Sequence, residues 1–443
     1  MAGAARNYPI IIMAFDRPDY FAQVLDSLLR QQGVDLASRS ITLFQDGCFN
    51  EHSRKDHADP EDIAGSIAVF RERFPKGRVA HSLVNLGVAL NFDRAERWVF
   101  EEVGAEAAIF LEDDMVLSPH YIRTIDRMLD MAMEDTRIGY VAAYGDWNRP
   151  LEKQREFPGR FLPLLQNWAF GLTRHQWRKN QNFMEQYLPF VRGIDYRARP
   201  HTKIYDLYTS HGMARVESSQ DRAKLIACVL TGGVRLNTTA CLAQYIGAVG
   251  LHSKAADYAR SGCARTEIYP DGNFEFERLT HAAYHRLMAE QAAAVEAKSP
   301  VLDKNAPLTF NIDGTGLRGL RQSFYQPEGW GVWSGNARSV VSVKLPVRRE
   351  AGPRTLWITG AHFAHSAKEE VEVEVRGNGG ALGTIHLGHV HKRAALPLPA
   401  GVERDDGALE LEFCSPVTGC PQEAGFAQDA RRLSVGLVKL ELE

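Results

Sequence analysis

The sequence of 443 residues has few cysteines and no long apolar run. Its six cysteines are widely spaced and show no CxxC pair, which argues against a zinc site and against a disulfide framework. No apolar run approaches the roughly 20 residues that a membrane helix needs, and the early run 10–15 is followed by Asp16-Arg17-Pro18 without a signal-peptide cleavage pattern. We therefore expect a cytoplasmic protein without a transmembrane segment, and peripheral association with the inner membrane stays open.

The charges also lack a strong bias. The formal net charge is -3, charged residues make up 24% and hydrophobic residues 44% of the chain. This balance is ordinary for a folded globular protein and gives no electrostatic reason to expect nucleic acid as a partner. The length exceeds one ordinary domain, so we expect two.

The character of the sequence changes near residue 300. Residues 8–285 alternate short apolar strands with helical segments, whereas the part from about residue 307 contains short β-type runs separated by Gly and Pro. Residues 281–299 have a helix-forming composition and end at Pro300. The sequence thus predicts an α/β domain over residues 1–300 and an all-β sandwich over residues 307–443.

Three apolar strands of the first part end in polar or acidic residues. They are residues 9–15, followed by Asp16-Arg17-Pro18; residues 41–44, followed by Gln45-Asp46-Gly47; and residues 107–111, followed by Glu112-Asp113-Asp114. In open α/β sheets the ligand crevice lies outside the carboxyl ends of the strands. All three sets of side chains are therefore expected to face one pocket.

The acidic triplet raises an electrostatic problem. Glu112 and Asp114 share one face of an extended segment, and neighbouring like charges raise one another's pKa unless a cation neutralises them. A hard divalent ion, Mn²⁺ or Mg²⁺, solves this and leaves coordination positions for a diphosphate. A solvated acidic turn is the simpler alternative for a bare EDD string, but the flanking apolar strand favours a site.

Four motifs in order, "PIIIMAFDRPDYFAQVLDSLL", "ITLFQDG", "NLGVALNFDRA" and "AAIFLEDDMVLSPHYI", extend this pattern. They resemble the GT-A glycosyltransferases of the N-acetylglucosaminyltransferase I type and their bacterial relatives, over most of residues 8–255. The resemblance implies a Rossmann-like fold and a metal-assisted transferase that uses a nucleotide-sugar.

The resemblance also implies roles for individual residues. Asp114 would be the direct metal ligand, and Glu112 and Asp113 would lie near the ribose and sugar. Arg17 would lie beside the nucleotide, where a guanidinium suits phosphate, and Asp46 would lie by the base. A surface arginine near a helix start explains Arg17 equally well.

Further candidates flank these motifs. Asn85 precedes a glycine and a helix start that can approach a ligand closely, although a plain helix start explains it almost as well. In "NWAFGLTRHQW", Trp168 and Phe170 have the position of the family's sugar and acceptor pocket, but aromatic residues at such spacing are more often core. His252 resembles a metal- or phosphate-binding histidine of some GT-A enzymes, and a structural role is the alternative.

Residues 218–253 contain the candidate catalytic base. By resemblance Asp221, at the start of a helix, is the base of an inverting displacement, which takes a proton as the acceptor hydroxyl attacks. Asp221 can also be a helix N-cap, and Glu217 and Asp206 are alternative bases.

Two regions have weaker signals. Residues 193–216 are rich in Arg, His and Tyr, have no counterpart that we can assign in the family, and suit either a loop for an anionic acceptor or a solvated loop. Residues 324–346 and 429–442 resemble β-sandwich modules attached to some bacterial glycosyltransferases. Trp330 and Trp333 there suit a sugar-binding platform or ordinary packing, and the module suits glycan binding, dimerisation or docking at a membrane complex.

Together the sequence predicts an inverting, metal-dependent glycosyltransferase that moves a sugar, with GlcNAc as a candidate, from a UDP-sugar to a glycan or polysaccharide acceptor. The rival is a non-catalytic glycan- or nucleotide-binding protein that retains the fold. A nucleotidyltransferase ranks last, because a glycine-rich phosphate loop with lysine is missing near the N-terminus. A homo-oligomer stays open.

Overall fold

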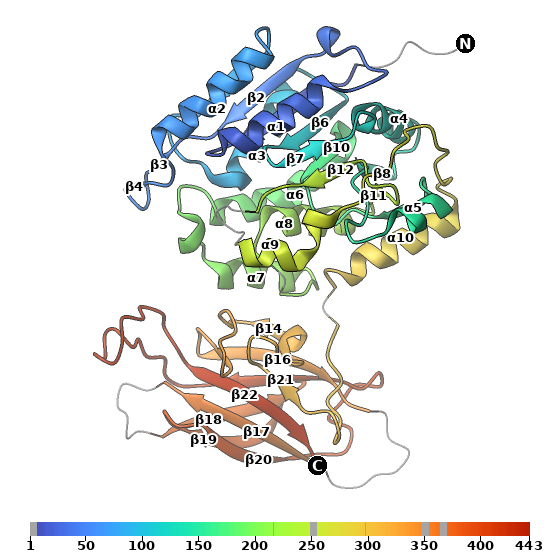
Figure 1. Cartoon of the computed structure of the whole chain (residues 1–443). Coiled ribbons are helices and arrows are strands. Elements are labelled where there is room, and N and C mark those ends of the chain that lie inside the picture. Colours follow the sequence, from blue (N-terminus) through green and yellow to red (C-terminus); the bar gives the residue numbers. More distant parts are fainter. Residues whose placement is uncertain (1–6, 216, 249–254, 297, 347–353, 364–369) are drawn as a thin grey trace. The chain divides into compact units, whose positions relative to one another are not determined.

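The computed structural model describes residues 7–215, 217–248, 255–296, 298–346, 354–363 and 370–443 (Figure 1). The chain divides into two compact units. The first comprises Met1–Arg199 and Ser219–Ala294, and the second comprises Pro200–Ser218 and Val295–Glu443. Residues Pro200–Ser218, which lie inside the first domain expected from the sequence, thus group with the β-rich part of the chain.

The first unit is built on a mixed eight-stranded sheet in the order β5-β2-β1-β6-β10-β8-β11-β9. Its strands are β1 (Ile10–Ala14), β2 (Ile41–Gln45), β5 (Arg78–His81), β6 (Ala107–Glu112), β8 (Ile138–Ala142), β9 (Phe161–Pro163), β10 (Ala169–Thr173) and β11 (Val234–Thr238). Strands β5, β2, β1 and β6 run parallel, and β10 is antiparallel to β6 and β8. The short strands β7 (Met115–Leu117) and β12 (Ala243–Tyr245) pair separately, as do β3 (Phe49–Asn50) and β4 (Lys55–Asp56).

Helices cover both faces of this sheet. The described helices of the unit are α1 (Pro18–Leu29), α2 (Pro60–Arg73), α3 (Gly87–Arg97), α4 (Tyr121–Glu134), α5 (Leu151–Glu156), α6 (Arg174–Tyr187), α8 (Gln220–Leu230), α9 (Ala255–Ser261) and α10 (His281–Ala293). Successive residues of β10 show the two layers: the ring of Phe170 packs on Phe92 of α3, whereas Gly171 faces Leu129 of α4. Burial on both faces explains why β1 and β6 are near-continuous apolar runs.

The second unit contains two five-stranded sheets. One holds β13 (Leu308–Thr309), β15 (Val332–Trp333), β17 (Arg354–His362), β20 (Lys392–Leu398) and β22 (Val435–Leu442). The other holds β14 (Leu320–Gln322), β16 (Arg338–Lys344), β18 (Val371–Gly377), β19 (Gly380–Leu387) and β21 (Ala408–Cys414). Neighbouring strands within each of these two sheets pair antiparallel.

The two sheets share one apolar core. Leu356 and Ile358 of β17 and Leu437 of β22 cluster with Val373 and Leu411 of the other sheet. In β18, Val371, Val373 and Val375 are buried while the residues between them are not, which is the alternation of a strand with one face on a core. The expectation of an α/β part followed by a β-rich part is confirmed.

One helix of the second unit comes from the arginine-rich insert. Helix α7 (His201–Ser210) is tied to the segment before β15, because Asp206 accepts a hydrogen bond from the Ser323 backbone amide at 3.1 Å and Gln326 donates to the Tyr205 hydroxyl. Arg215 donates to the Phe324 carbonyl oxygen. Asp206, one of the alternative bases, therefore has a structural hydrogen bond within the second unit.

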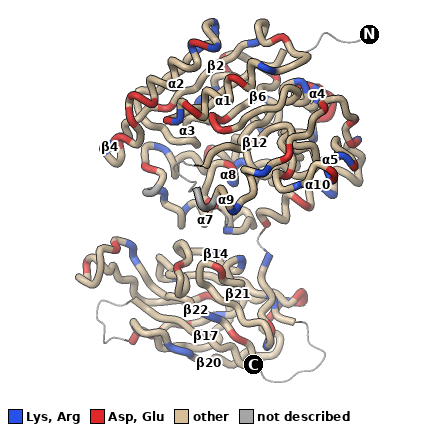
Figure 2. Tube along the Cα trace, in the orientation of Figure 1, with Lys and Arg blue, Asp and Glu red and all other residues tan. Residues whose placement is uncertain are grey.

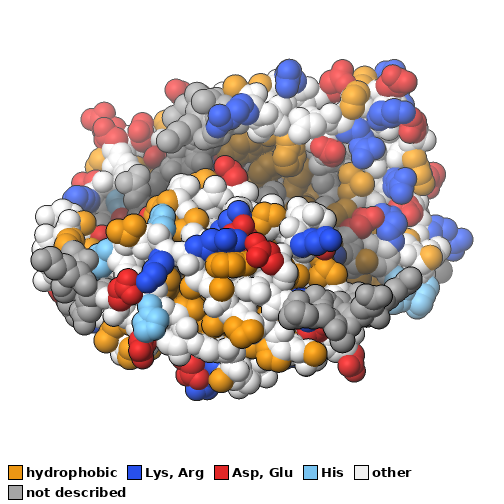
Figure 3. Space-filling model, turned by 90° about the horizontal axis from the view of Figure 1, so that it is seen from below, with side chains coloured by type: hydrophobic (Ala, Val, Ile, Leu, Met, Phe, Trp, Pro, Cys, Tyr) orange, Lys and Arg blue, Asp and Glu red, His pale blue; other side chains and the backbone are white. Residues whose placement is uncertain are grey.

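Charges of both signs are distributed along the chain of each unit (Figure 2). On the face drawn in Figure 3, Lys and Arg side chains lie among Asp, Glu and apolar side chains without forming one continuous basic area. Across the described residues, none of the helices combines the length and the apolar character needed to cross a membrane.

Candidate active site at the carboxyl ends of the strands

Three parallel strands end side by side at the candidate site. Strand β1 lies between β2 and β6, with Met13 opposite Glu112 and Ala14 opposite Gln45. The residues that follow these strands, Arg17, Asp46 and the triplet 112–114, therefore leave the same edge of the sheet. This is the arrangement that forms ligand crevices in α/β folds.

Arg17 joins two carboxylates of the triplet. Its guanidinium donates to Asp113, and its second terminal nitrogen lies 2.8 Å from Asp114 Oδ2. The other oxygen of Asp113 accepts a hydrogen bond from the Phe15 backbone amide at 3.1 Å. Asp113 is thus satisfied by the protein and orients Arg17.

Asp114 and Glu112 are short of compensating charge. Burial, opposed by Arg17, raises the pKa of Asp114 to about 6. Asp114 Oδ1 is buried and has no hydrogen-bond partner in the part of the chain that the structure describes. Burial, together with the nearby carboxylates of Asp114 and Asp221, raises the pKa of Glu112 well above its ordinary value. The site thus has acidic groups in excess and an unused acceptor atom.

Asp221 joins this cluster from α8. The helix begins after Ser219, whose hydroxyl accepts from the Arg222 amide, so Ser219 and not Asp221 is the N-cap. Gln220 Nε2 donates to Asp221 Oδ1 at 2.6 Å. Burial raises the pKa of the Asp221 carboxyl, while Arg235, Lys224 and the amides of Asn167 oppose this shift. Asp221 is close enough to the acidic triplet for its charge to raise the pKa of Glu112.

Two buried cations behind Asp221 were not expected from the sequence. Arg235 of β11 is 0% exposed, donates to the side-chain oxygen of Asn167, and has two further guanidinium nitrogens without a partner among the described residues. Lys224 of α8 lies 2.5 Å from Glu96 of α3, and both side chains are buried. Their sequence signal was weak: a single Arg inside the strand "VRLNT" and a single Lys inside an apolar helix.

Asp46 and Asn85 have structural contacts at the start of α3. The Asp46 carboxylate accepts hydrogen bonds from the backbone amides of Gly47 at 2.9 Å, Leu86 at 2.8 Å and Gly87 at 2.9 Å, and from the Asn85 side chain at 3.3 Å. Asp46 is 4% exposed. This contact network joins the end of β2 to the segment between β5 and α3 at the edge of the site. Base recognition by Asp46 stays a prediction.

The two aromatic candidates of the motif at 167–177 lie in different environments. Trp168 is half-buried and stacks on Tyr245 with ring centroids 4.8 Å apart. Phe170 is 0% exposed and stacks on Phe110 and Phe92 in the core. The expectation that Phe170 lines a pocket is therefore wrong, because Phe170 lies within β10, all of whose residues are buried, whereas Trp168 precedes the strand.

A short segment passes directly over Asp114. Tyr245 pairs with Met115 in the β7–β12 ribbon, and the Ile246 amide donates to the Asp114 carbonyl oxygen at 2.9 Å. A Cβ atom on Gly247 would lie 2.6 Å from Asp114 Oδ2, closer than any such contact allows. A side chain at this position would therefore have to displace the Tyr245 ring and the Asp114 carboxylate, which glycine avoids. His252 lies outside the described residues.

No family model matches the chain. Among the solved structures with partial similarity, S. aureus TarS 1–349, a glycosyltransferase, is 10% identical, with 53% of this chain and 57% of that chain covered and a TM-score of 0.31. A carbohydrate-binding module CBM36 in complex with calcium and xylotriose is 15% identical, with 26% and 80% covered and a TM-score of 0.18. A family 35 carbohydrate-binding module from an environmental isolate is 14% identical, with 33% and 82% covered and a TM-score of 0.17. All three scores are below 0.5, so the argument for a function rests on the site itself.

Proposed function

We propose that this protein is an inverting, metal-dependent glycosyltransferase of the GT-A type, which moves a sugar from a UDP-sugar to a glycan acceptor. The observation that carries the proposal is the meeting of Arg17, the triplet Glu112-Asp113-Asp114 and Asp221 at the carboxyl ends of parallel strands. Such a crevice offers an acidic side for a cation and a separate carboxylate for proton transfer.

Asp114 is the residue proposed to hold Mn²⁺ or Mg²⁺. Its Oδ1 atom is buried and has no described partner, which fits a metal ligand. The described residues contain no group of three or more His, Cys, Asp or Glu placed to hold a metal. An ion at this site would therefore be held by one or two carboxylates of the protein together with substrate phosphates. When bound, such an ion neutralises charge on the departing diphosphate.

Arg17 is proposed to serve the same diphosphate from the other side. Its guanidinium is held by Asp113, which fixes the direction of the fork, and Arg–phosphate pairs are strong and geometrically specific. Its other terminal nitrogen contacts Asp114 Oδ2 in the free protein. Donor binding would therefore exchange the Arg17–Asp114 contact for contacts of both groups with the diphosphate and its cation.

Asp221 is the proposed base. An acceptor hydroxyl oxygen forms a bond to the anomeric carbon, the bond from that carbon to the diphosphate oxygen breaks with its electron pair leaving on UDP, and the hydroxyl proton passes to Asp221. Burial raises the pKa of the carboxyl and so makes it a better proton acceptor than an ordinary aspartate. Gln220 and the amides of Asn167 orient it.

The direct test is UDP release from a panel of UDP-sugars, with Mn²⁺ and a mixture of oligosaccharides as acceptors. Asp221→Asn is expected to lower the rate by about 10² to 10⁴, and NMR of the product is expected to show an inverted anomeric configuration. Glu217→Gln is the matched control, because Glu217 is the alternative base of the same stretch. If Glu217→Gln loses the activity and Asp221→Asn retains it, the base assignment is wrong.

A second function has one observation in its favour. Arg17 already neutralises part of the acidic cluster without a metal, as expected for a protein that binds a nucleotide or glycan and performs no transfer. Tight nucleotide binding that is independent of Mn²⁺, together with no UDP release from any UDP-sugar, would favour this alternative.

A further inference from the structure

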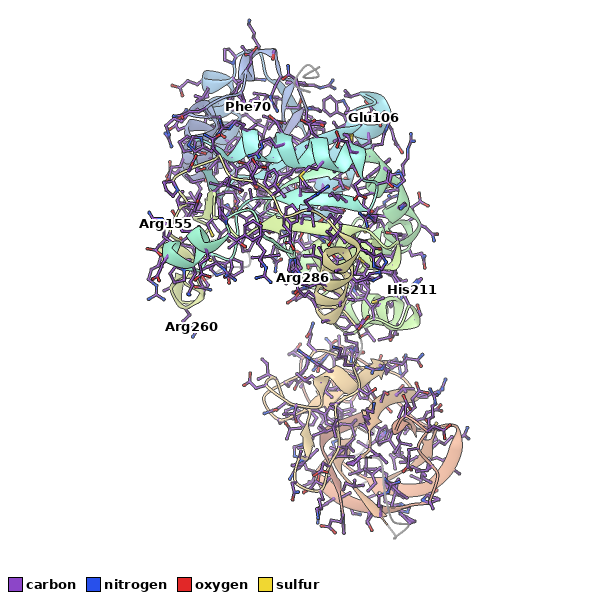
Figure 4. The ribbon with its side chains drawn as sticks, turned by 90° about the vertical axis from the view of Figure 1, so that its right-hand side faces the viewer. Phe70, Glu106, Arg155, His211, Arg260 and Arg286 are labelled. Carbon is purple, nitrogen blue, oxygen red and sulfur yellow. The ribbon has the colours of Figure 1, made fainter. Side chains whose placement is uncertain are left out.

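A second pocket lies beside the candidate active site in the first unit. It has a volume of about 200 Å³ and is formed by the turn before α5 and the turn after α9, with Trp147, Arg149, Gly262, Arg265 and Glu267 in its lining. Figure 4 shows α5 and α9 at one edge of the unit, where Arg155 and Arg260 are labelled. A pocket of this size is smaller than the sites of drug-sized ligands and suits one ring or one charged group of a longer ligand.

The two turns that form the pocket are fastened to each other. Trp147 Nε1 donates to the Ser261 carbonyl oxygen at 3.0 Å, and Glu267 Oε2 accepts from the Leu151 backbone amide at 2.6 Å. Gly262 has φ +83°, and a side chain there would clash with Asn148. These contacts join segments more than 100 residues apart in sequence, so the pocket is a built feature of the unit.

The charges of the pocket favour an anion. Neither Arg149 nor Arg265 forms an ion pair with any residue that the structure describes, and Arg149 Nε is buried without a partner. The only carboxylate in the lining, Glu267, already caps the first amide of α5. Two guanidinium groups against one engaged carboxylate leave an excess of one positive charge, which matches a single carboxylate on a ligand.

A row of aromatic rings connects this pocket with Asp114. Trp147 lies 5.3 Å from Trp168, and Trp168 stacks on Tyr245 at 4.8 Å, both measured between ring centroids. Tyr245 borders Asp114, since both flank the position of a Cβ on Gly247. Because these rings pack on one another, they form one aromatic cluster between the pocket and the candidate site. Trp147, which lines the pocket, is the member of the cluster that can pack against the apolar face of a sugar ring there.

We propose that this pocket is an acceptor subsite for a carboxylate-bearing sugar, a hexuronate residue of the acceptor glycan, held by Arg149 and Arg265 with its ring against Trp147. The proposal rests on the proposed transferase function and gives its acceptor a chemical class. In this assignment the uronate anchors one end of the acceptor, and the rest of the acceptor extends from Trp147 toward the Tyr245 and Asp114 end of the aromatic cluster.

The test is calorimetric titration of the full chain with sodium glucuronate at low salt, with glucose and sodium phosphate as comparison probes. Arg149→Gln/Arg265→Gln is the main variant, and the exposed Arg265→Gln alone serves if the double variant does not fold. Arg155→Gln on α5 is the matched control, because it removes an arginine outside the pocket. Charge-assisted hydrogen bonds predict a loss of about tenfold or more in glucuronate affinity for the pocket variants and none for the control.

Three results would overturn the inference: no glucuronate binding by the wild type, equal binding of glucose or phosphate, or unchanged glucuronate binding by the pocket variants. The titration needs neither nucleotide nor metal, so it separates the two proposals. Glucuronate binding without UDP binding would support the anion-binding pocket and contradict the proposed transferase function. UDP binding without glucuronate binding would contradict the pocket proposal and leave the proposed transferase function standing.

Discussion

The buried ion pair between Lys224 and Glu96 connects the helix of the candidate base Asp221 to α3, and its contribution to stability can be measured. The two side chains are 2.5 Å apart and 3% and 5% exposed, and they join α8, which carries Asp221, to α3. Lys224 also lies over the ring of Phe92 at 4.5 Å. Lys224→Met removes the cation, keeps most of the apolar stem and leaves Glu96 as a buried, unpaired carboxylate.

The expected cost follows from that unpaired charge. Breaking a buried pair by removing one partner destabilises a protein by about 3 to 5 kcal/mol, whereas replacing both partners by apolar residues is often neutral. Lys224→Met should therefore lower the stability of α3 and α8 by that amount, and Glu96→Leu/Lys224→Met should recover most of it. The exposed pair Lys153–Glu156 is the control, and Lys153→Met should cost less than about 1 kcal/mol.

The pH dependence has a definite sign. Burial raises the pKa of Glu96 in the folded protein, and Lys224 opposes this shift. Without Lys224 the folded-state pKa rises further above the unfolded value, so the variant loses stability as the pH rises through that pKa and regains it on acidification. The assay is urea-dependent hydrogen exchange of the α3 and α8 amides by mass spectrometry, which separates the two units. A cost below about 1 kcal/mol for Lys224→Met, or none recovered in the double variant, would refute the reasoning.

Three further predictions concern the site. Because burial raises the pKa of Asp221, the rate of UDP release should fall on acidification at a pH above the ordinary aspartate pKa of about 3.9; if the residual activity of Asp221→Asn falls over the same pH range, another group is responsible for the loss. Asp46→Ala should lower the stability of the first unit by about 2 to 4 kcal/mol in thermal or urea unfolding, because it leaves three backbone amides without their acceptor, that of Gly47 after β2 and those of Leu86 and Gly87 at the start of α3; an unchanged midpoint would contradict this. Gly247→Ala should weaken nucleotide binding measured by calorimetry while the protein stays folded, because the new methyl group would overlap the Tyr245 side chain and lie 2.6 Å from Asp114 Oδ2, and so displace both; wild-type affinity would contradict this.

The sequence was sufficient for features that follow from local pattern. Continuous apolar runs predicted β1 and β6 as strands, and in the structure both are buried along almost their whole length. The polar residues directly after them correctly predicted that Arg17 and the triplet meet at one sheet edge. The alternating valines of β18 and the turn-rich composition after residue 307 indicated a β-rich second part.

Features that depend on tertiary packing could not be predicted. The salt bridge between Arg17 and Asp113 joins residues 96 positions apart, and local sequence cannot distinguish Arg17 from a surface arginine. Arg235 and Lys224 are charged types that are usually exposed, and only the fold shows that both are buried behind Asp221. Phe170 belongs to the same local motif as Trp168, and the two differ because Phe170 lies within the buried strand β10 whereas Trp168 precedes it.

The central claim is that Asp114 holds a divalent metal for a UDP diphosphate, and calorimetric titration with UDP, with and without Mn²⁺, tests it most directly. The account predicts UDP binding that requires Mn²⁺ in the wild type, weakens at least about tenfold in Asp114→Asn, and exceeds the binding of GDP and CMP. UDP binding that is equal without Mn²⁺, equal in Asp114→Asn, or absent under every condition would contradict it.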